Sequence, residues 1–469
     1  MADPTQGAPG SALTGVEYQG GDFASLLKKE FKPKSDEAKS AVENAVLTLA
    51  QQALSQTKLV STDVVNSIES MIAELDRKLT EQINLIMHHP EFQQLESAWR
   101  GLHHLVNNTE TDEMLKIRVM NVSKNDLAKT LKRYKGTAWD QSPPDVELLG
   151  EMSKIAAASM APFIAAASPN LMQMGSWQEL ANPRDLTKIF TTPEYAAWRS
   201  LRESDDARYV GLAMPRFLAR QPYGAKTNPV EDFNFEEDTA GADHNKYAWA
   251  NAAYAMAVNI NRSFKMYGWC SRIRGIESGG AVEGLPTHTF PTDDGGVDMK
   301  CPTEIAISDR REAELAKNGF MPLLHRKNSD FAAFIGAQSL QKPDEYDDPD
   351  ATANANLAAR LPYLFATCRF AHYLKCIVRD KVGSFKERDD MRRWLQDWVT
   401  QYVDGDPAHS SERIKAEKPL AAAEVQVEEV EGNPGFYAAK FFLRPHYQLE
   451  GLTVSLRLVS KLPSAKGGK

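Results

Sequence analysis

The stretch YVGLAMPRFL, residues 209–218, is one of the short apolar runs that decide the fold class of this chain. A similar run precedes it, MLKIRVMNV at 114–122, and two follow it, TEIAI at 303–307 and FAAFIGA at 331–337. Helical patterns and turns rich in glycine and proline separate these runs. Short apolar segments that alternate with helices are typical of mixed helix and sheet proteins, so the sequence predicts an α/β (mixed α+β) body.

Helical patterns precede this body. One covers residues 35–55, and a second begins at a Ser61-Thr62-Asp63 cap. The apolar residues of the second recur every three or four positions, at Val64, Ile68, Ile72, Leu75, Leu79, Ile83 and Ile86. Pro90 fits the first turn of a third helix, whose apolar stripe comprises Phe92, Leu95, Trp99, Leu102 and Val106. These helices form either a small bundle or a partner-binding surface.

The C-terminal part of the sequence combines helices and strands. We expect one long helix at about 354–380, a second from near Glu387, and a loop at 404–419. Three β-like runs close the chain, at 422–430, 436–443 and 452–458. The last run alternates apolar and polar residues, as a half-buried strand does, and a strand so late in a chain often lies at a sheet edge that invites pairing.

Composition restricts the class of protein. The 469 residues are 42% hydrophobic and 25% charged, with a net charge of -8, which argues against a dedicated binder of nucleic acid or anionic membrane. The longest apolar run, at 155–168, carries Pro162 and is too short to span a bilayer. No secretory signal and no CxxC pair appears, and the four cysteines lie far apart, at Cys270, Cys301, Cys368 and Cys376. The sequence therefore predicts a soluble cytoplasmic protein.

Local motifs of catalysis are missing. The histidine pairs at 88–89 and 103–104 are adjacent, so the members of each pair project about 100° apart on a helix and favour a structural role over a metal site. PYGAKT at 222–227 lacks the glycine that a phosphate loop needs before its lysine, and ESGGAVEG at 277–284 indicates a turn or a close backbone crossing. We expect no enzyme activity, no cofactor and no metal. A cytoplasmic enzyme with a non-local active site and a soluble scaffold protein remain the alternatives.

One charged segment stands out, ISDRREAELAKNGF at 307–320. Ser308 or Asp309 can cap a short helix that Gly319 ends. This helix is either a solvated surface helix or a docking helix that meets a partner through complementary charge. Its charged residues are Asp309, Arg310, Arg311, Glu312, Glu314 and Lys317.

Six long stretches, in order along the chain, resemble one family: the large sheath subunit of the bacterial type VI secretion system, the TssC/VipB family. They are HPEFQQLESAWRGLHHLV at 89–106, GWCSRIRGIESGGAVEGLP at 268–286, PTEIAISDRREAELAKNGFMPLLH at 302–325, FIGAQSLQKP at 334–343, ERDDMRRWLQDW at 387–398 and RPHYQLEGLTVSLRLVSKLP at 444–463. The resemblance covers about residues 16–463.

This resemblance implies a contractile, phage-tail-sheath-like fold and a structural role without catalysis. A member of the family pairs with the small sheath subunit, TssB/VipA, and polymerises helically with copies of itself around the Hcp tube. Its contraction propels the tube and spike, and the ATPase ClpV disassembles the contracted sheath. The resemblance further implies contacts with baseplate components, no nucleic acid, no membrane insertion, and a cytoplasmic place in a membrane-anchored apparatus.

The resemblance also implies a domain plan. The expected parts are a disordered tail at 1–14, an N-terminal arm at 15–33, a helical segment contacting the small subunit at 34–110, the α/β sheath body at 111–353, a C-terminal sheath domain with inter-protomer strands at 354–463, and a flexible tail at 464–469. One departure from the family pattern follows Ser142, where Pro143-Pro144-Asp145 replaces a longer segment. If that segment is absent, the central sheet loses a strand.

Two sets of assembly residues follow by analogy with the family. The tube-facing helix is expected on residues 309–317, with residues 388–397 as the alternative. Strands shared between protomers are expected near the arm at 16–27 and in the last two β-like runs, at Phe436, Ala438, Lys440, Phe442, Leu452, Val454, Leu456 and Leu458.

Overall fold

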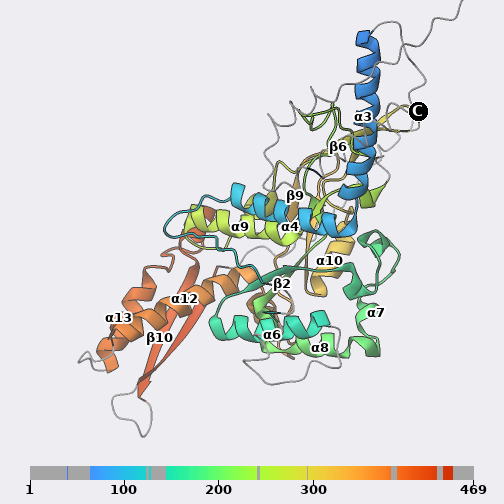
Figure 1. The fold of residues 1–469 in the computed structure, drawn as a ribbon. Coiled ribbons are helices and arrows are strands. Elements are labelled where there is room, and N and C mark those ends of the chain that lie inside the picture. Colours follow the sequence, from blue (N-terminus) through green and yellow to red (C-terminus); the bar gives the residue numbers. More distant parts are fainter. Residues whose placement is uncertain are drawn as a thin grey trace, which may run out of the picture. The chain divides into compact units, whose positions relative to one another are not determined.

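The computed structural model describes residue 40 and residues 64–122, 126–127, 144–239, 243–292, 294–381, 388–429 and 437–446. Two compact units make up the chain. The first comprises Met1–Ile86 and Tyr223–Glu237, and the second comprises Met87–Pro222 and Asp238–Lys469. Among the described residues, no helix has the length and apolar character needed to cross a membrane. Figure 1 shows the elements of both units.

Helix α3 (Val64–Met87) dominates the described part of the first unit and confirms the strongest periodic pattern in the sequence. Asn84 Nδ2 on this helix donates a hydrogen bond to the carbonyl of Glu236, 3.0 Å away. Its apolar stripe is poorly covered, because Ile72 is 52% exposed and Ile86 is 57% exposed. The described residues therefore do not bury this stripe in a helical bundle.

The central sheet of the second unit has the strand order β1-β2-β8-β9-β5. Strands β1 (Phe163–Ala166), β2 (Val210–Met214) and β8 (Phe320–His325) are parallel, whereas β9 (Ala332–Phe334) and β5 (Ala281–Val282) join antiparallel. All five residues of β2 are buried, as expected of a parallel strand covered on both faces. The strand predicted within YVGLAMPRFL is thus confirmed as the centre of the sheet.

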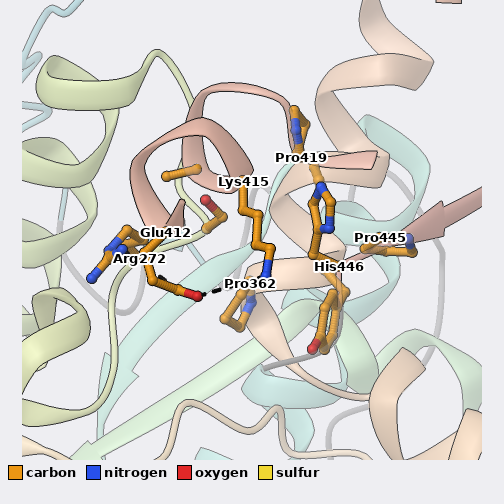
Figure 2. Close-up of a pocket in the computed structure, with 11 residues that line it drawn as sticks. Arg272, Pro362, Glu412, Lys415, Pro419, Pro445 and His446 are labelled. Atoms are coloured by element: carbon orange, nitrogen blue, oxygen red, sulfur yellow. Dashed lines mark ion pairs between the residues drawn. The ribbon is translucent and has the colours of Figure 1, made fainter. Parts of the chain in front are cut away.

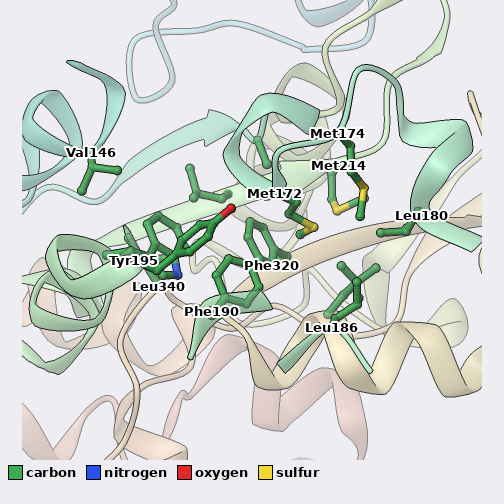
Figure 3. Packing of buried hydrophobic residues seen from close by; sticks show 14 of the residues in the cluster. Val146, Met172, Met174, Leu180, Leu186, Phe190, Tyr195, Met214, Phe320 and Leu340 are labelled. Atoms are coloured by element: carbon green, nitrogen blue, oxygen red, sulfur yellow. The ribbon is translucent and has the colours of Figure 1, made fainter. Parts of the chain in front are cut away.

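One face of this sheet packs against α6 (Pro144–Ser159) and α8 (Ala196–Glu203). Trp198 stacks on Phe190 and on Phe320 of β8, with ring centroids 5.9 and 6.0 Å apart. Figure 3 shows Phe190 and Phe320 side by side in this cluster. Such aromatic packing buries large apolar areas and fixes the strand against the helices.

The other face packs against α9 (Ala252–Tyr267) and α12 (Leu361–Lys381). A Cβ atom at Gly211 would lie 2.9 Å from Ile164 Cδ1, Leu361 Cδ1 and Met321 Cε, so only glycine fits there without movement. Alternation along β2 therefore supplies both layers: Leu212 and Met214 belong to the first core, and Ala213 belongs to the second.

The apolar run at 155–168 contains the end of one element and the whole of another, with Pro162 between them. Helix α6 ends at Ser159, and β1 begins at Phe163. Two other apolar runs, at 114–122 and 303–307, form no strand. Among the described residues, none forms a ladder with 114–122, and a single strand is not stable without pairing or packing.

The helix expected at 354–380 is wrong as one element. The structure has α11 (Pro349–Ala358) and then α12, separated by residues 359–360. Pro362 disfavours a helical conformation in the residue before it and supplies no N–H, so it fits only the first turn of a new helix. The N–H of Leu361 instead donates to the carbonyl of Ala337, 2.9 Å away.

A C-terminal layer follows, in which α12, α13 (Arg388–Thr400) and β10 (Leu420–Glu429) lie together (Figure 1). Strand β10 pairs antiparallel with β11 (Tyr437–Pro445), with an irregularity between Leu420 and Ala422. Leu395 and Val399 of α13 are buried against Val425 and Val427 of β10. The first two β-like runs are confirmed, whereas the run at 452–458 lies outside the described residues.

The expected loop at 404–419 contains a short helix, α14 (Glu412–Glu417), which Ser411 caps. The second unit has further elements, most of them short. They are α4 (Pro90–Asn107), α7 (Thr187–Phe190), α10 (Asp309–Lys317), the pairs β3 (Phe217–Leu218) with β4 (Trp249–Ala250) and β6 (His288–Pro291) with β7 (Val297–Lys300), a π-helical turn at Ile276–Gly280, and 3-10 turns at Pro169–Met172, Trp177–Ala181, Pro193–Tyr195, Asp205–Tyr209 and His244–Lys246.

The glycines of ESGGAVEG do mark a close backbone crossing. Gly279 has φ +91°, which L side chains rarely adopt. A Cβ atom at Gly280 would collide with the carbonyl oxygen of Phe334 and lie 2.7 Å from the carbonyl carbon of Arg274. These neighbours are backbone atoms and cannot rotate away, so the glycine is a packing requirement and not part of a nucleotide site.

We predict that Gly280→Ala lowers the free energy of unfolding by about 3 kcal/mol, because the added methyl group forces β9 and the 272–280 segment apart. Gly405→Ala is the matched control, since no atom lies within 4 Å of a Cβ built there. The control should change stability by less than about 0.5 kcal/mol. Urea unfolding curves of both variants measure the difference, and equal midpoints would contradict the crossing as a constraint.

Candidate assembly surfaces

Helix α10 is fixed to the body by its ends and one apolar residue. Ser308 Oγ accepts the N–H of Arg311 at 3.4 Å, which confirms the predicted cap. Leu315 is fully buried in the core under α8 and β8. After the helix, Gly319 has φ +87° and leads directly into β8.

Arginine side chains of α10 tie the helix to the body, and Arg310 does so by donating to the carbonyl of Arg184 at 3.3 Å. Arg311 pairs with Glu314 at 2.7 Å and donates to the carbonyl of Pro183 at 2.6 Å. Both side chains are less than a quarter exposed. Their charges are therefore engaged within the chain and are poorly placed to meet a partner.

The outward side of α10 carries a different subset. Asp309, Arg310 and Lys317 are exposed, together with the small residue Ala313. Arg310 is 81% exposed although it reaches Glu314 at 3.2 Å. Because positions 309, 313 and 317 recur every four residues, they form one stripe along the helix. The structure thus divides the predicted tube-facing set into an outward group and an anchoring group.

Glu312 belongs to neither group. It is half-buried on the wall of a cleft with a volume of about 680 Å³, which Arg274 and Arg360 also line. Burial raises the pKa of the Glu312 carboxyl, and the nearby charge of Arg360 opposes that shift. The cleft therefore adds positive charge beside the exposed stripe.

The alternative helix, α13, also has an exposed charged side. Arg392, Arg393 and Asp397 are exposed, whereas Leu395 and Val399 are buried against the hairpin. The geometry leaves both helices available to a partner.

The predicted inter-protomer residues of β11 share one face. Ala438, Lys440 and Phe442 are exposed, and Phe442 is 54% exposed. Their neighbours Phe441 and Leu443 point to the core of the C-terminal layer. Lys440 pairs with Glu428 of β10 at 2.8 Å. Phe436, Leu452, Val454, Leu456 and Leu458 lie outside the described residues, as does the arm at 16–27.

A small pocket with a volume of about 50 Å³ lies at the base of the β10–β11 hairpin (Figure 2). Glu412 of α14 lies 3.7 Å from Arg272 and 3.9 Å from Lys415. His446, which follows β11, donates from Nε2 to the carbonyl of Lys418 at 3.0 Å and lies 3.8 Å from Asp404 Oδ2. This volume holds one or two water molecules, so the pocket is a structural junction.

The buried carboxylate of Glu304 also holds parts of the fold together. Glu304 accepts two hydrogen bonds from Arg216, at 2.6 and 2.7 Å, and lies 3.0 Å from His244 Nε2. Burial works against its ionisation, but the hydrogen bonds from Arg216 and His244 outweigh burial and lower its pKa. These bonds fix Glu304 within the 303–307 segment, where Thr303 forms an isolated bridge with Phe217 and no strand follows.

The third predicted helix, α4, turns its apolar stripe away from the body. Trp99 is 64% exposed and Leu95 is 56% exposed. The side in contact with the body carries Gly101, which lies against the ring of Tyr254, and His104, whose ring is 5.0 Å from Phe217. Burial lowers the pKa of His104 and His103 lowers it further, so His104 is a packing residue.

Sequence reasoning missed one exposed segment. At 114–122, Met114, Val119 and Met120 are each more than two-thirds exposed, although the run was expected in the α/β body. Lys265 holds the start of this segment through Asp112, with 2.7 Å between Nζ and Oδ2. The alternation of Leu115 and Ile117 with charged residues was the available signal, but it does not reveal whether a strand partner lies in the same chain.

We predict that the hairpin base weakens in mild acid. Burial lowers the pKa of His446, so the folded chain favours the neutral imidazole. That contribution to stability is present above the usual pKa of about 6.5 and is lost as the pH falls through the lowered native value. His446→Gln keeps a donor for Lys418 but does not titrate. Urea unfolding at about pH 7.5 and about pH 5.5 should show a larger loss for the unmodified chain than for His446→Gln, and equal losses would contradict this role.

Comparison with known proteins adds sequence relationships to this geometry. The family model VipB, described as the EvpB tail sheath N-terminal domain, matches residues 69–143 and 137–341. A second model, the tail sheath gpW/gp25-like domain, matches residues 350–462. The two matches of the first model meet at 137–143, where the sequence was expected to depart from its relatives.

Similar individual proteins are also known. The type VI secretion system sheath protein TssC1 of Pseudomonas aeruginosa is 76% identical over 479 residues, and the match covers 96% of each chain. Among solved structures, a chain of the anti-feeding prophage baseplate has 10% identity and a TM-score of 0.42, over 77% of this chain and 80% of that one. A chain of the contracted PVC sheath complex, an extracellular contractile injection system, has 11% identity and a TM-score of 0.34, over 64% and 63%.

Proposed function

Because the chain belongs to the VipB tail sheath family and is a subunit of a type VI secretion contractile sheath, we propose that it stacks helically around an Hcp inner tube and contracts to propel tube and spike. The observation that carries this proposal is the 76% identity to a sheath protein over 96% of both chains. Sheath subunits assemble with copies of themselves and with a small sheath partner. This role is structural, and we propose that it requires no catalysis and no cofactor.

The finer partners belong to the same proposal. We assign contacts with the small subunit TssB/VipA, with baseplate components, and with the ClpV ATPase that takes the contracted sheath apart. The chain acts in the bacterial cytoplasm, as part of a membrane-anchored apparatus. It binds no nucleic acid and does not insert into a membrane.

The helical segment at 34–110 is assigned to the small subunit. The stripes of α3 and α4 support this assignment, since Ile72, Leu95 and Trp99 are each more than half exposed. Large apolar side chains that are aligned along helices and left in water mark sites of protein association. Aromatic residues such as Trp99 also supply much of the binding energy of interfaces.

Helix α10 is assigned to the tube. The fold uses Leu315, Arg311 and Glu314 to hold the helix. Arg310 donates to the carbonyl of Arg184 at 3.3 Å but is 81% exposed, and Asp309 and Lys317 are exposed beside it. Charged groups at such a surface determine orientation and register more than they add affinity. That behaviour suits a sheath subunit, which must sit in one register on the tube and release it after contraction.

The strands of the C-terminal layer are assigned to contacts between protomers, with Ala438, Lys440 and Phe442 on the exposed face of β11. Main-chain pairing between chains can persist while the bodies rotate, because hinge residues at the ends of a strand can absorb the rotation. The extended sheath would then store energy in the arrangement of whole subunits.

We predict that simultaneous Asp309→Lys, Arg310→Glu and Lys317→Glu substitutions prevent sheath formation on the tube and leave a soluble complex with the small subunit. Reversed charges would face like charges on the tube, which costs several kcal/mol at an interface. Negative-stain electron microscopy of cells that express both sheath subunits and the tube protein counts the tubules.

The matched variant reverses Arg392, Arg393 and Asp397 on α13. It should form tubules in normal numbers. If the α10 variant assembles normally and the α13 variant does not, the tube contact belongs to α13 and not to α10.

A further inference from the structure

Two sections of the outer edge of β10 are occupied by other parts of the same chain. At its start, the N–H of Leu420 donates to the carbonyl of Tyr402, and the N–H of Asp404 donates to the carbonyl of Leu420. Val403 and Leu420 form a parallel bridge there. A short backbone segment therefore pairs with β10 on the side opposite β11.

Further along β10, a side chain takes the place of a strand. Gln396 of α13 accepts the N–H of Val425 at 2.9 Å and donates from Nε2 to the carbonyl of Ala423 at 3.0 Å. The two bonds together fix the orientation of the amide, since only its oxygen can accept the N–H. A side-chain amide that bonds in this way reproduces the contacts of one residue in a neighbouring strand.

These bonds also determine which backbone groups of β11 point away from β10. In an antiparallel pair, opposite residues alternate between hydrogen-bonded and non-hydrogen-bonded positions. Ala423 and Val425 direct their bonding groups toward Gln396, so their partners Leu443 and Phe441 occupy non-hydrogen-bonded positions. The backbone groups of Leu443 and Phe441 therefore point to the far edge of β11. Within the described part of the chain, no residue pairs with that edge.

We propose that Gln396 caps β10 and thereby restricts strand addition between subunits to the far edge of β11. This inference rests on the proposed function, because it concerns where a neighbouring sheath subunit pairs. An edge with two occupied sections is protected, whereas an open edge is a template for another strand. Gln396 is thus a positioning residue that gives the C-terminal layer a single direction of growth.

Charge and burial specify the kind of strand that fits. On the exposed face, β11 carries Lys440 and Arg444, whereas β10 carries Glu424 and Glu428. On the inner face, Phe441 and Leu443 continue the core of the layer. A strand beside β11 should therefore place acidic residues next to Lys440 and Arg444 and apolar residues next to Phe441 and Leu443.

The test compares hydrogen exchange of single amides in the chain complexed with a small sheath subunit, before and after assembly into sheaths. Before assembly, Val425 should already be protected, and Gln396→Met should speed its exchange about tenfold, as expected for the loss of one hydrogen bond. Gln401→Met is the control, because the amide of Gln401 bonds only to the carbonyl of Trp398 among the described residues. Gln401→Met should leave the exchange rate of the Val425 amide unchanged.

On assembly, Phe441 and Leu443 should gain at least about tenfold protection while Val425 gains none. The proposed role of Gln396 would be contradicted if the Val425 amide became protected from exchange only on assembly. It would also be contradicted if that protection survived Gln396→Met. If Gln396→Met does not fold, Gln396→Glu retains the acceptor for Val425 and loses the donor to Ala423, so Val425 should stay protected. Failure of the unmodified complex to form sheaths would instead count against the proposed function, while the exchange of Val425 still decides the cap.

Discussion

Backbone N–H and C=O groups along a strand need hydrogen-bond partners. In the C-terminal layer, the described residues supply such partners along the outer edge of β10 but not along the outer edge of β11. Strand β10 is covered by β11, by the segment at Tyr402–Asp404 and by Gln396. Strand β11 is covered by β10 alone among the residues described. An incomplete sheet of this kind is a liability for an isolated protein and a connection point for a subunit of an assembly.

The body of the second unit makes a contrast with this layer. The central sheet is enclosed by two cores, one around Trp198 and Phe320 and one around Met321 and Leu361. Both faces of this sheet are therefore covered by the chain itself. The helices with exposed charged or apolar sides are fixed to this body by side chains on their inner sides. Leu315 and Arg311 hold α10. The buried Glu96–Arg220 ion pair and the packing of Gly101 and His104 hold α4. This division suits a subunit that rotates as one body while its connections to neighbours persist.

The sequence predicts the elements whose determinants are local. Period and caps identified α3, α4 and α10. The single helix at 354–380 was wrong because Pro362 was not read as a helix start. The stripe of α4 was correct as a pattern, but periodicity cannot tell whether an apolar face meets the body or a partner. For the same reason the run at 114–122 was expected in the body and is exposed.

The candidate site was predictable as a set of charges but not in its division of roles. The charged residues of α10 are similar in type, and their roles differ because their side chains face different sides of the helix. Burial of Leu315 in the core fixes which side of the helix faces the body. Gln396 gave no signal in the sequence, because its role depends on two backbone groups about 30 residues away that only the fold brings near.

Cryo-electron microscopy of this chain assembled with a small sheath subunit tests the account most directly. The account predicts hollow tubules in which a strand of a neighbouring subunit lies beside β11, while Gln396 still bonds to Ala423 and Val425 of β10. Monodisperse particles without tubules would contradict the sheath role, and tubules in which the neighbour pairs with β10 would contradict the single direction of growth.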